Sequence, residues 1–178
     1  MIDARNYRVV ETLRNGVQLC IRSARPDDTD RLVEAFHELD PASVYLRFFC
    51  PKKELSAAEL QRFREIDFRT RVVLFGTVQR DEREIIIASG TYIRSDEDAA
   101  EVAFLVEEDY HGLGIARRLL KHLANVAVDA GVRRFTAEVL PHNAAMRSVF
   151  ERCGWPVRTR AADGVMHIEL ALDKTGPG

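Results

Sequence analysis

The chain contains few cysteines and no long apolar run. Its 178 residues include only three cysteines, Cys20, Cys50 and Cys153, which form no Cys-x-x-Cys pair and no cluster with metal-ligand spacing. This scarcity argues against a disulfide framework and a metal site, and it fits a reducing compartment. No segment approaches the roughly 20 apolar residues of a membrane span. Charged residues within the first ten positions exclude an apolar signal segment, so we expect a cytoplasmic protein that does not bind membranes.

An excess of charge of one sign is also missing. Lys and Arg number 26, Asp and Glu number 28, and the formal net charge is −2. Nucleic-acid binding needs a concentrated basic surface, so we expect no nucleic-acid partner. The hydrophobic fraction of 46% is ordinary, and this length suits one domain with one core. We expect a single domain over residues 16–172, a partly ordered polar segment at 1–15 and a frayed tail at 173–178.

Apolar periodicity predicts a mixed order of strands and helices. Alternating or continuous apolar positions predict strands at 17–22, 72–78, 84–93, 101–106, 134–140, 157–159 and 165–172. Helical spacing predicts helices between the turn at 25–28 and Leu39, and at 42–49, 56–66, 114–130 and 143–153. This order predicts a mixed α/β (α+β) fold, with a central, mostly antiparallel, twisted sheet of about seven strands and helices on both faces.

A strand, a glycine turn and a helix follow one another over residues 101–116. A helix that starts in this way directs several unpaired N–H groups and the positive end of its dipole at one point, which suits a phosphate. Because Gly112 and Gly114 have no side chains, an anion can approach the backbone closely. Such turns are common in α/β proteins, however, and this one alone is weak evidence for a ligand.

Two motifs together resemble those of the GCN5-related N-acetyltransferases (GNAT). The segment His111–Ala116 resembles their acyl-CoA signature Q/R-x-x-G-x-G/A, with Gly114 and Ala116 at the small positions and His111 where Gln or Arg is usual. Downstream, the chain resembles the family's N-x-x-(A/M)…(Y/F)-E-x-x-G-(F/W) helix through Asn143, Ala144, Ala145, Met146, Phe150, Gly154 and Trp155. The resemblance covers the whole expected domain and implies the GNAT fold, with acetyl-CoA as co-substrate.

The resemblance also implies where coenzyme A binds. Backbone amides of residues 111–116 would hold the diphosphate, Arg117 and Arg118 would meet the adenosine 3′-phosphate, and the end of the preceding strand would pair with the pantetheine amides. Asn143 would reach the pantetheine arm, although it could simply cap its own helix. The implied cofactor-binding residues are Leu105, Val106, His111, Gly112, Leu113, Gly114, Ile115, Ala116, Arg117, Arg118, Asn143 and Phe150.

Acetyl transfer to an amine requires a base, because a lysine amine is almost wholly protonated at neutral pH. Glu101, ten residues before His111, is our candidate and matches the usual glutamate of the family's lysine acetyltransferases. A solvated glutamate at a strand end is the plainer alternative, and Glu107 and Glu108 are weaker candidates. The resemblance also implies that the backbone N–H of Val106 donates to the thioester carbonyl.

One position departs from the family pattern. Many members have a tyrosine, which can protonate the leaving thiolate, where this chain has Phe150. Phenylalanine cannot donate a proton, so another group or water must do so. This departure favours the alternative of a non-catalytic acyl-CoA-binding sensor, whereas Glu101 argues for an enzyme.

The acceptor amine is the least determined part of the reaction. Residues 43–49, Ser-Val-Tyr-Leu-Arg-Phe-Phe, resemble a segment of bacterial protein lysine acetyltransferases that act on acyl-CoA synthetases, although a packed amphipathic helix would also explain them. We therefore predict a protein lysine as acceptor, with a small amine (a polyamine, amino acid or drug) as the alternative. Those enzymes often carry a regulatory domain that these residues lack, so we expect no such regulation in cis. Family members are often dimers, which makes a second copy of the chain a candidate partner.

Overall fold

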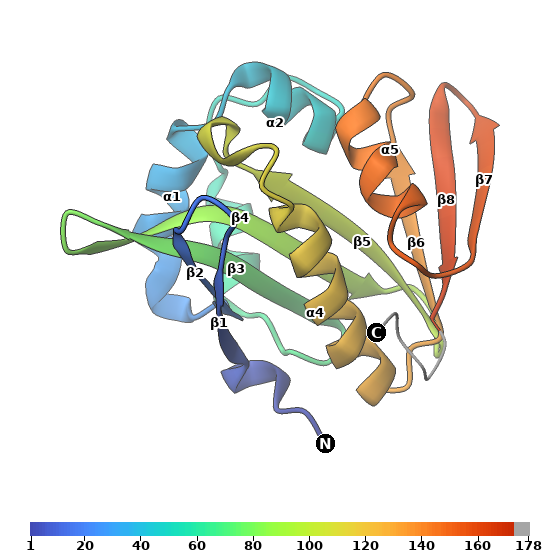
Figure 1. The fold of residues 1–178 in the computed structure, drawn as a ribbon, viewed down its shortest axis with the longest axis horizontal. Coiled ribbons are helices and arrows are strands. Elements are labelled where there is room, and N and C mark those ends of the chain that lie inside the picture. Colours follow the sequence, from blue (N-terminus) through green and yellow to red (C-terminus); the bar gives the residue numbers. More distant parts are fainter. Residues whose placement is uncertain (173–178) are drawn as a thin grey trace.

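The structure, a computed structural model, describes residues 1–172 as one eight-stranded sheet with helices on both faces (Figure 1). The strands are β1 (Arg8–Thr12), β2 (Gln18–Ser23), β3 (Arg71–Arg80), β4 (Arg83–Arg94), β5 (Ala99–Val106), β6 (Arg134–Val139), β7 (Val157–Ala162) and β8 (Val165–Ala171). The helices are α1 (Thr29–His37), α2 (Pro41–Phe48), α3 (Ala57–Arg64), α4 (Ile115–Asp129) and α5 (Ala144–Glu151). The predicted mixed fold is confirmed.

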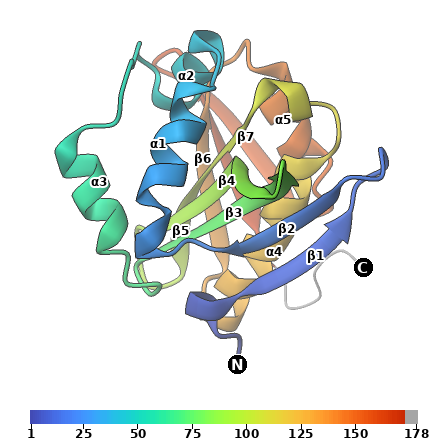
Figure 2. The same cartoon turned by 90° about the vertical axis from the view of Figure 1, so that its left-hand side faces the viewer.

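The strand order is β1-β2-β3-β4-β5-β6-β8-β7, and every neighbouring pair is antiparallel except β5 and β6. Figure 2 shows α1, α2 and α3 on one side of the sheet and α4 and α5 on the other. Within residues 1–172 no helix is both long and apolar enough to cross a membrane.

The sheet has one strand more than the sequence predicted. This strand, β1, lies in the polar segment that we expected to be only partly ordered, and it pairs with β2 from Arg8↔Arg22 to Thr12↔Gln18. Because β1 is an edge strand, alternate residues face solvent, and its apolar pattern is too short to indicate a strand. The tail that we expected to be frayed lies outside the described residues.

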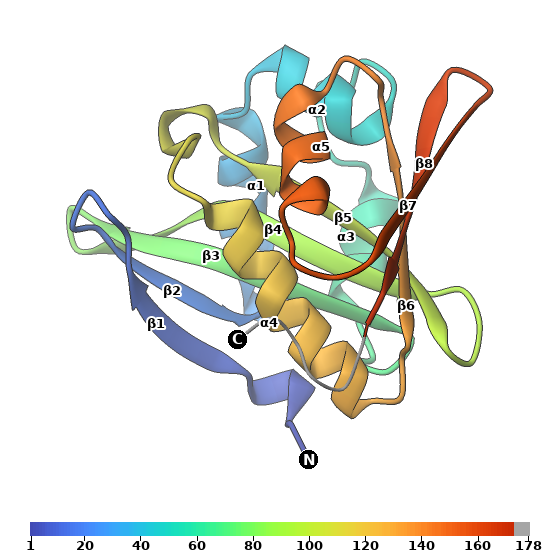
Figure 3. The ribbon, with the colours of Figure 1, turned by 45° about the vertical axis from the view of Figure 1, so that its right-hand side comes forward.

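The two parallel strands are paired only where they begin. Their register runs from Ala99↔Arg134 to Glu101↔Thr136. Beyond these three pairs β5 continues beside β4 and β6 continues beside β8, so the two strands diverge (Figure 3). One edge of β5 is therefore without a strand partner from residue 102 to 106, and a notch opens between the two strands.

Close packing fixes α4 against the sheet beside this notch. The buried face of α4 includes Leu119 and Leu123, both fully buried in the main core. At Gly90 on β4, a Cβ atom would lie only 2.9 Å from Leu123 Cδ1 and 3.0 Å from Phe104 Cε1. Glycine at this position therefore lets the middle of α4 approach the strand closely.

Candidate active site

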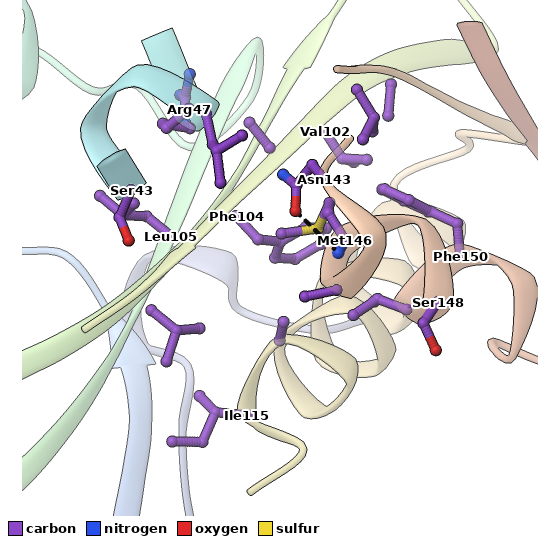
Figure 4. A pocket seen from close by; sticks show the side chains of 18 of the residues that line it. Ser43, Arg47, Val102, Phe104, Leu105, Ile115, Asn143, Met146, Ser148 and Phe150 are labelled. Carbon is purple, nitrogen blue, oxygen red and sulfur yellow. Dashed lines mark hydrogen bonds between the residues drawn. The ribbon is translucent and has the colours of Figure 1, made fainter. Parts of the chain in front are cut away.

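A cavity of about 540 Å³ occupies the notch between β5 and β6. Its walls come from α2, β5, the turn before α4, the first turn of α4, β6 and α5, as Figure 4 shows in part. The predicted site residues that line it are Glu101, Leu105, Val106, His111, Gly112, Gly114, Ile115, Ala116, Arg117, Asn143 and Phe150. The structure thus brings most of the predicted residues to one place, while Leu113 and Arg118 do not line the cavity.

The turn before α4 presents a run of free backbone donors. Gly112 and Gly114 have φ angles of 78° and 76°, which glycine adopts at little cost, and nothing lies within 4 Å of the position that a Cβ atom would take. Among residues 1–172, no group accepts a hydrogen bond from the N–H of any residue from 112 to 117. These donors and the α4 dipole suit a diphosphate, so this part of the site fits coenzyme A.

A side-chain hydrogen bond closes the turn onto the strand. The Nε2 atom of His111 lies 2.7 Å from the carbonyl oxygen of Val106, so the imidazole N–H donates to that carbonyl. The sequence offered His111 only as an exposed turn residue or as a source of a backbone N–H. Its side chain instead links the turn to the end of β5 and positions the free donors relative to the strand edge.

The open edge of β5 offers further backbone groups. The N–H of Glu107 donates to the Ile87 carbonyl on β4 at 2.8 Å. Backbone groups alternate between the two edges of a strand, so the N–H and C=O of Phe104 and the N–H of Val106 face the other edge, where β6 has diverged, while the Val106 carbonyl on this edge accepts from His111. Peptide-like amides can pair with such an edge by strand addition.

Glu101 lies at the end of the cavity remote from the turn. Its side chain is exposed and shares a face with Ala103 and Leu105, whereas Val102 and Phe104 are buried in the core, as the predicted alternation requires. Five residues of extended strand separate Glu101 from Val106, a span of about 17 Å. The cavity therefore has a donor-rich end and a carboxylate end, which the strand edge connects.

The two weaker base candidates lie outside the cavity. Neither Glu107 nor Glu108 lines the cavity. The Oε2 atom of Glu107 is buried, without a hydrogen-bond partner among residues 1–172, and this burial raises the pKa of the carboxyl group. Glu108 accepts a hydrogen bond from the Asp40 N–H at 2.9 Å.

The wall formed by α5 combines a polar cap and an apolar ring. The Oδ1 atom of Asn143 accepts from the Met146 N–H at 3.2 Å, which confirms the predicted helix cap (Figure 4). Phe150 is 1% exposed, and its ring centroid lies 6.1 Å from that of Phe104. Phe150 is therefore packed in the core at the cavity wall and brings no hydroxyl group.

The two arginines that we expected at the adenosine 3′-phosphate point to different places. Arg117 lines the cavity, but Arg118 donates to Glu11 of β1 at 2.8 Å. Glu11 also accepts from His122 at 2.9 Å. Arg118 thus holds β1 against α4, and the sequence could not indicate this because β1 itself was not predicted.

Sequence reasoning did not select two further parts of the wall. Ser43, Leu46 and Arg47 of α2 line the cavity, as do the β6 residues 137–139. The α2 segment had been noted only for its resemblance to protein lysine acetyltransferases. The β6 residues become visible only once the divergence of β5 and β6 is known.

The comparisons with known proteins agree with the observed fold. The model of the Acetyltransferase (GNAT) family matches residues 31–155, more than half of the chain. The chain is 30% identical over 141 residues to Acetyltransferase PA5475 of Pseudomonas aeruginosa, which covers 79% of this chain and 76% of that protein. It is 33% identical over 160 residues to Acetyltransferase Pat of Mycolicibacterium smegmatis, covering 89% of this chain and 47% of that protein, so it spans about half of Pat.

Among solved structures, the GNAT domain of S. lividans PAT superposes with a TM-score of 0.85 at 38% identity, covering 93% of this chain and 97% of that one. Its overall fold is therefore similar to that of the present chain.

Proposed function

This chain belongs to the acetyltransferase (GNAT) family, and on that premise we propose that it transfers the acetyl group of acetyl-CoA to a lysine side chain of another protein. The observation that carries this proposal is the single cavity that joins the free N–H groups of residues 112–117 to the carboxylate of Glu101. Two further points support a protein acceptor: the family-like segment at 43–49 lines the same cavity, and relatives named Pat and PAT match this chain.

Each part of the cavity has a distinct task in this reaction. Acetyl-CoA supplies the acetyl group in activated form, as a thioester. The N–H groups of residues 112–117 and the α4 dipole bind its diphosphate, and the open edge of β5 pairs with its pantetheine amides. The N–H of Val106 donates to the thioester carbonyl and stabilises the negative charge that develops there.

Glu101 removes a proton from the acceptor ammonium group through intervening water, because its backbone lies about 17 Å along the strand from that of Val106. The neutral nitrogen then forms the new C–N bond, the C–S bond breaks, and the thiolate leaves. The nitrogen also loses its second proton; because Phe150 cannot donate one, water carries this proton to the thiolate.

The test is thiol release from acetyl-CoA with a panel of acceptors that contains acyl-CoA synthetases, polyamines, amino acids and amine drugs. We expect release that depends on a protein, with the mass of one acetyl group added at a lysine. The Glu101→Gln variant should lose at least about 100-fold of its turnover at pH 7, since general-base catalysis contributes this much, and should bind acetyl-CoA normally. Glu97→Gln, at an exposed position in the turn before β5, is the matched control.

Two outcomes would contradict the proposal. Rapid release with a small amine and none with any protein would assign the enzyme to small-molecule acetylation. Tight binding of acetyl-CoA with no release for any acceptor would favour the non-catalytic sensor.

A further inference from the structure

One row of side chains crosses three strands at the Glu101 end of the cavity. Arg71 on β3 is opposite Ile93 on β4, and Ile93 is opposite Glu101 on β5, so all three project from the same face. With about 4.8 Å between strands, the backbones of Arg71 and Glu101 are about 10 Å apart. Ile93 is 49% exposed although it belongs to an inner strand. This end of the sheet face is therefore uncovered.

The neighbouring rows on the same face are covered. Val73 and Phe75 follow Arg71 on this face of β3, and both are buried in a second core with Phe63 of α3. The helices thus cover the sheet up to the row of Arg71, Ile93 and Glu101 and leave that row open.

A second arginine reaches the same region from α2. Arg47 lines the cavity together with Glu101, and Figure 4 shows it beside β5, on the opposite side from Asn143. Among residues 1–172, no group accepts a hydrogen bond or forms an ion pair with the guanidinium of Arg47 or Arg71, and the guanidinium of Arg47 lies 4.9 Å from the centroid of the Phe48 ring. The Nε atom of Arg71 is buried and unpartnered. We call Arg47, Arg71 and Ile93 the arginine patch.

This lack of ion pairs at the half-buried Arg47 and Arg71 contrasts with Arg22, a fully buried arginine of the same protein. Arg22 is 3% exposed and forms ion pairs with Asp28 at 2.7 Å and Glu84 at 2.9 Å. A charge that is fully removed from water is normally paired, because desolvation is costly. Arg47 and Arg71 are half-buried, so water can reach their guanidinium groups and an incoming anion can replace it, and the buried Nε of Arg71 has no partner within the described part of the chain. The arginine patch therefore has the chemistry of an anion site that another molecule completes.

The electrostatics of the patch agree with this geometry. Burial lowers the pKa of Arg47, and the charge of Arg71 lowers it further, whereas Glu101 acts in the opposite direction. Burial also lowers the pKa of Arg71, with a further contribution from Arg62. The positive charges of Arg47 and Arg71 thus repel each other, and a carboxylate between them would relieve this repulsion.

The anion cannot be the diphosphate of coenzyme A if that diphosphate binds at the turn before α4. The turn adjoins Val106, about 17 Å along the strand from Glu101, and the patch lies at the Glu101 end. An anion at the patch must therefore arrive with the second substrate.

We propose that Arg47 and Arg71 bind a carboxylate of the acceptor protein, supplied by an Asp or Glu two or three residues from the target lysine, while Ile93 contacts the chain between them. This inference rests on the proposed function and names its substrate class. Residues two or three apart in an extended chain are about 7 to 10 Å apart, which matches the spacing of Arg71 and Glu101. The planar guanidinium group is suited to bidentate binding of a carboxylate.

The first test uses short peptides with one lysine, which differ only in having Glu or Gln two and three residues from it. We expect kcat/KM at least about tenfold higher for the Glu peptides, mainly through KM. Arg71→Gln and Arg47→Gln should each bring this ratio close to one and leave the KM for acetyl-CoA unchanged, which also shows that the variants are folded. Arg158→Gln, at an exposed position on β7, is the control and should keep the ratio.

The second test does not depend on turnover. Succinate is titrated into the full chain while the arginine Nε–H resonances are followed by NMR, and we expect a saturable shift of the Arg71 signal. Equal acetylation of Glu and Gln peptides would overturn the inference while the proposed function stands. A saturable shift without acetylation of any protein or peptide would support the anion site while the proposed function fails. A shift that never saturates would overturn the site.

Discussion

At the scale of single residues, the hydrogen bond between the His111 ring and the Val106 carbonyl holds the turn before α4 to the end of β5. That turn carries the free N–H groups of residues 112–117. His111→Ala removes this bond, so the turn is no longer held to the strand. One hydrogen bond contributes about 0.5–1.5 kcal/mol, and we therefore expect the KM for acetyl-CoA to rise by about two- to thirteenfold. His111→Gln retains an N–H donor and should recover part of the loss. Steady-state kinetics at fixed acceptor measure both, and an unchanged KM in the alanine variant would show that the turn holds its shape unaided.

Single residues also show where sequence reasoning succeeds. The capping role of Asn143 was predictable, because a cap and its partner are three residues apart in the chain. The partners of His111, Arg118 and Arg47 were not predictable, because each depends on which distant segment the fold brings close. The assignments of Glu101 as base and Val106 as donor to the thioester stay predictions.

At the scale of elements, a polar cluster attaches β1 to α4. The Tyr7 hydroxyl lies 2.6 Å from Nδ1 of His122, and Glu11 accepts from both His122 and Arg118. Burial raises the pKa of Glu11, but its hydrogen bonds to Arg118 and His122 lower it more, so the pKa lies below its ordinary value of 4.5. The charged form of Glu11 is therefore favoured by folding.

This cluster predicts acid sensitivity of the edge strand. A carboxyl group whose pKa is lowered by folding contributes its full stabilisation at pH values above its pKa of 4.5 in the unfolded chain. This contribution is lost as the pH falls through the lower pKa of the folded protein. We expect hydrogen exchange of the β1 amides to accelerate relative to exchange in β3 as the pH falls below 4.5. Glu11→Gln should abolish that extra dependence. If exchange of the β1 amides in the Glu11→Gln variant still accelerated below pH 4.5, a group other than Glu11 would be responsible for the acid sensitivity.

The types of most elements were predictable from periodicity, but their pairing was not. Residues 114–130 have helical spacing and form α4 within one residue at each end, because the pattern is long and regular. The strand β1 was missed because an edge strand needs few apolar residues. The divergence of β5 and β6 depends on contacts between distant segments and has no signature in either strand alone.

At the scale of the whole molecule, binding of acetyl-CoA should stabilise the fold, because only the folded chain assembles the cavity. A ligand at about 100 times its Kd adds about 2.7 kcal/mol to the free energy of unfolding. Thermal melting with coenzyme A and with 3′-dephospho-coenzyme A then tests the adenosine site. We expect a smaller rise in Tm for the dephospho form, and Arg117→Gln should remove the difference. Arg118→Gln is the matched control, since its side chain is paired with Glu11.

Two results would contradict this expectation. An unchanged Tm at saturating coenzyme A would mean that the free N–H groups do not bind the diphosphate. If coenzyme A and its 3′-dephospho form raised the Tm equally in the Arg118 variant but not in the Arg117 variant, Arg118 and not Arg117 would bind the 3′-phosphate.

The sheet of residues 1–172 consists of two parts, one made of β1 to β5 and the other of β6, β8 and β7. The two parts are joined by the three β5–β6 residue pairs that run from Ala99 to Glu101 on β5. If one part rotates against the other, these pairs act as the pivot, and each backbone atom moves in proportion to its distance from them. Glu101 then moves least, while Val106 and the turn beyond it move most. The entrance for the co-substrate, at the Val106 end of the notch, would widen in such a rotation. The backbone of Glu101 would stay paired with Thr136 of β6.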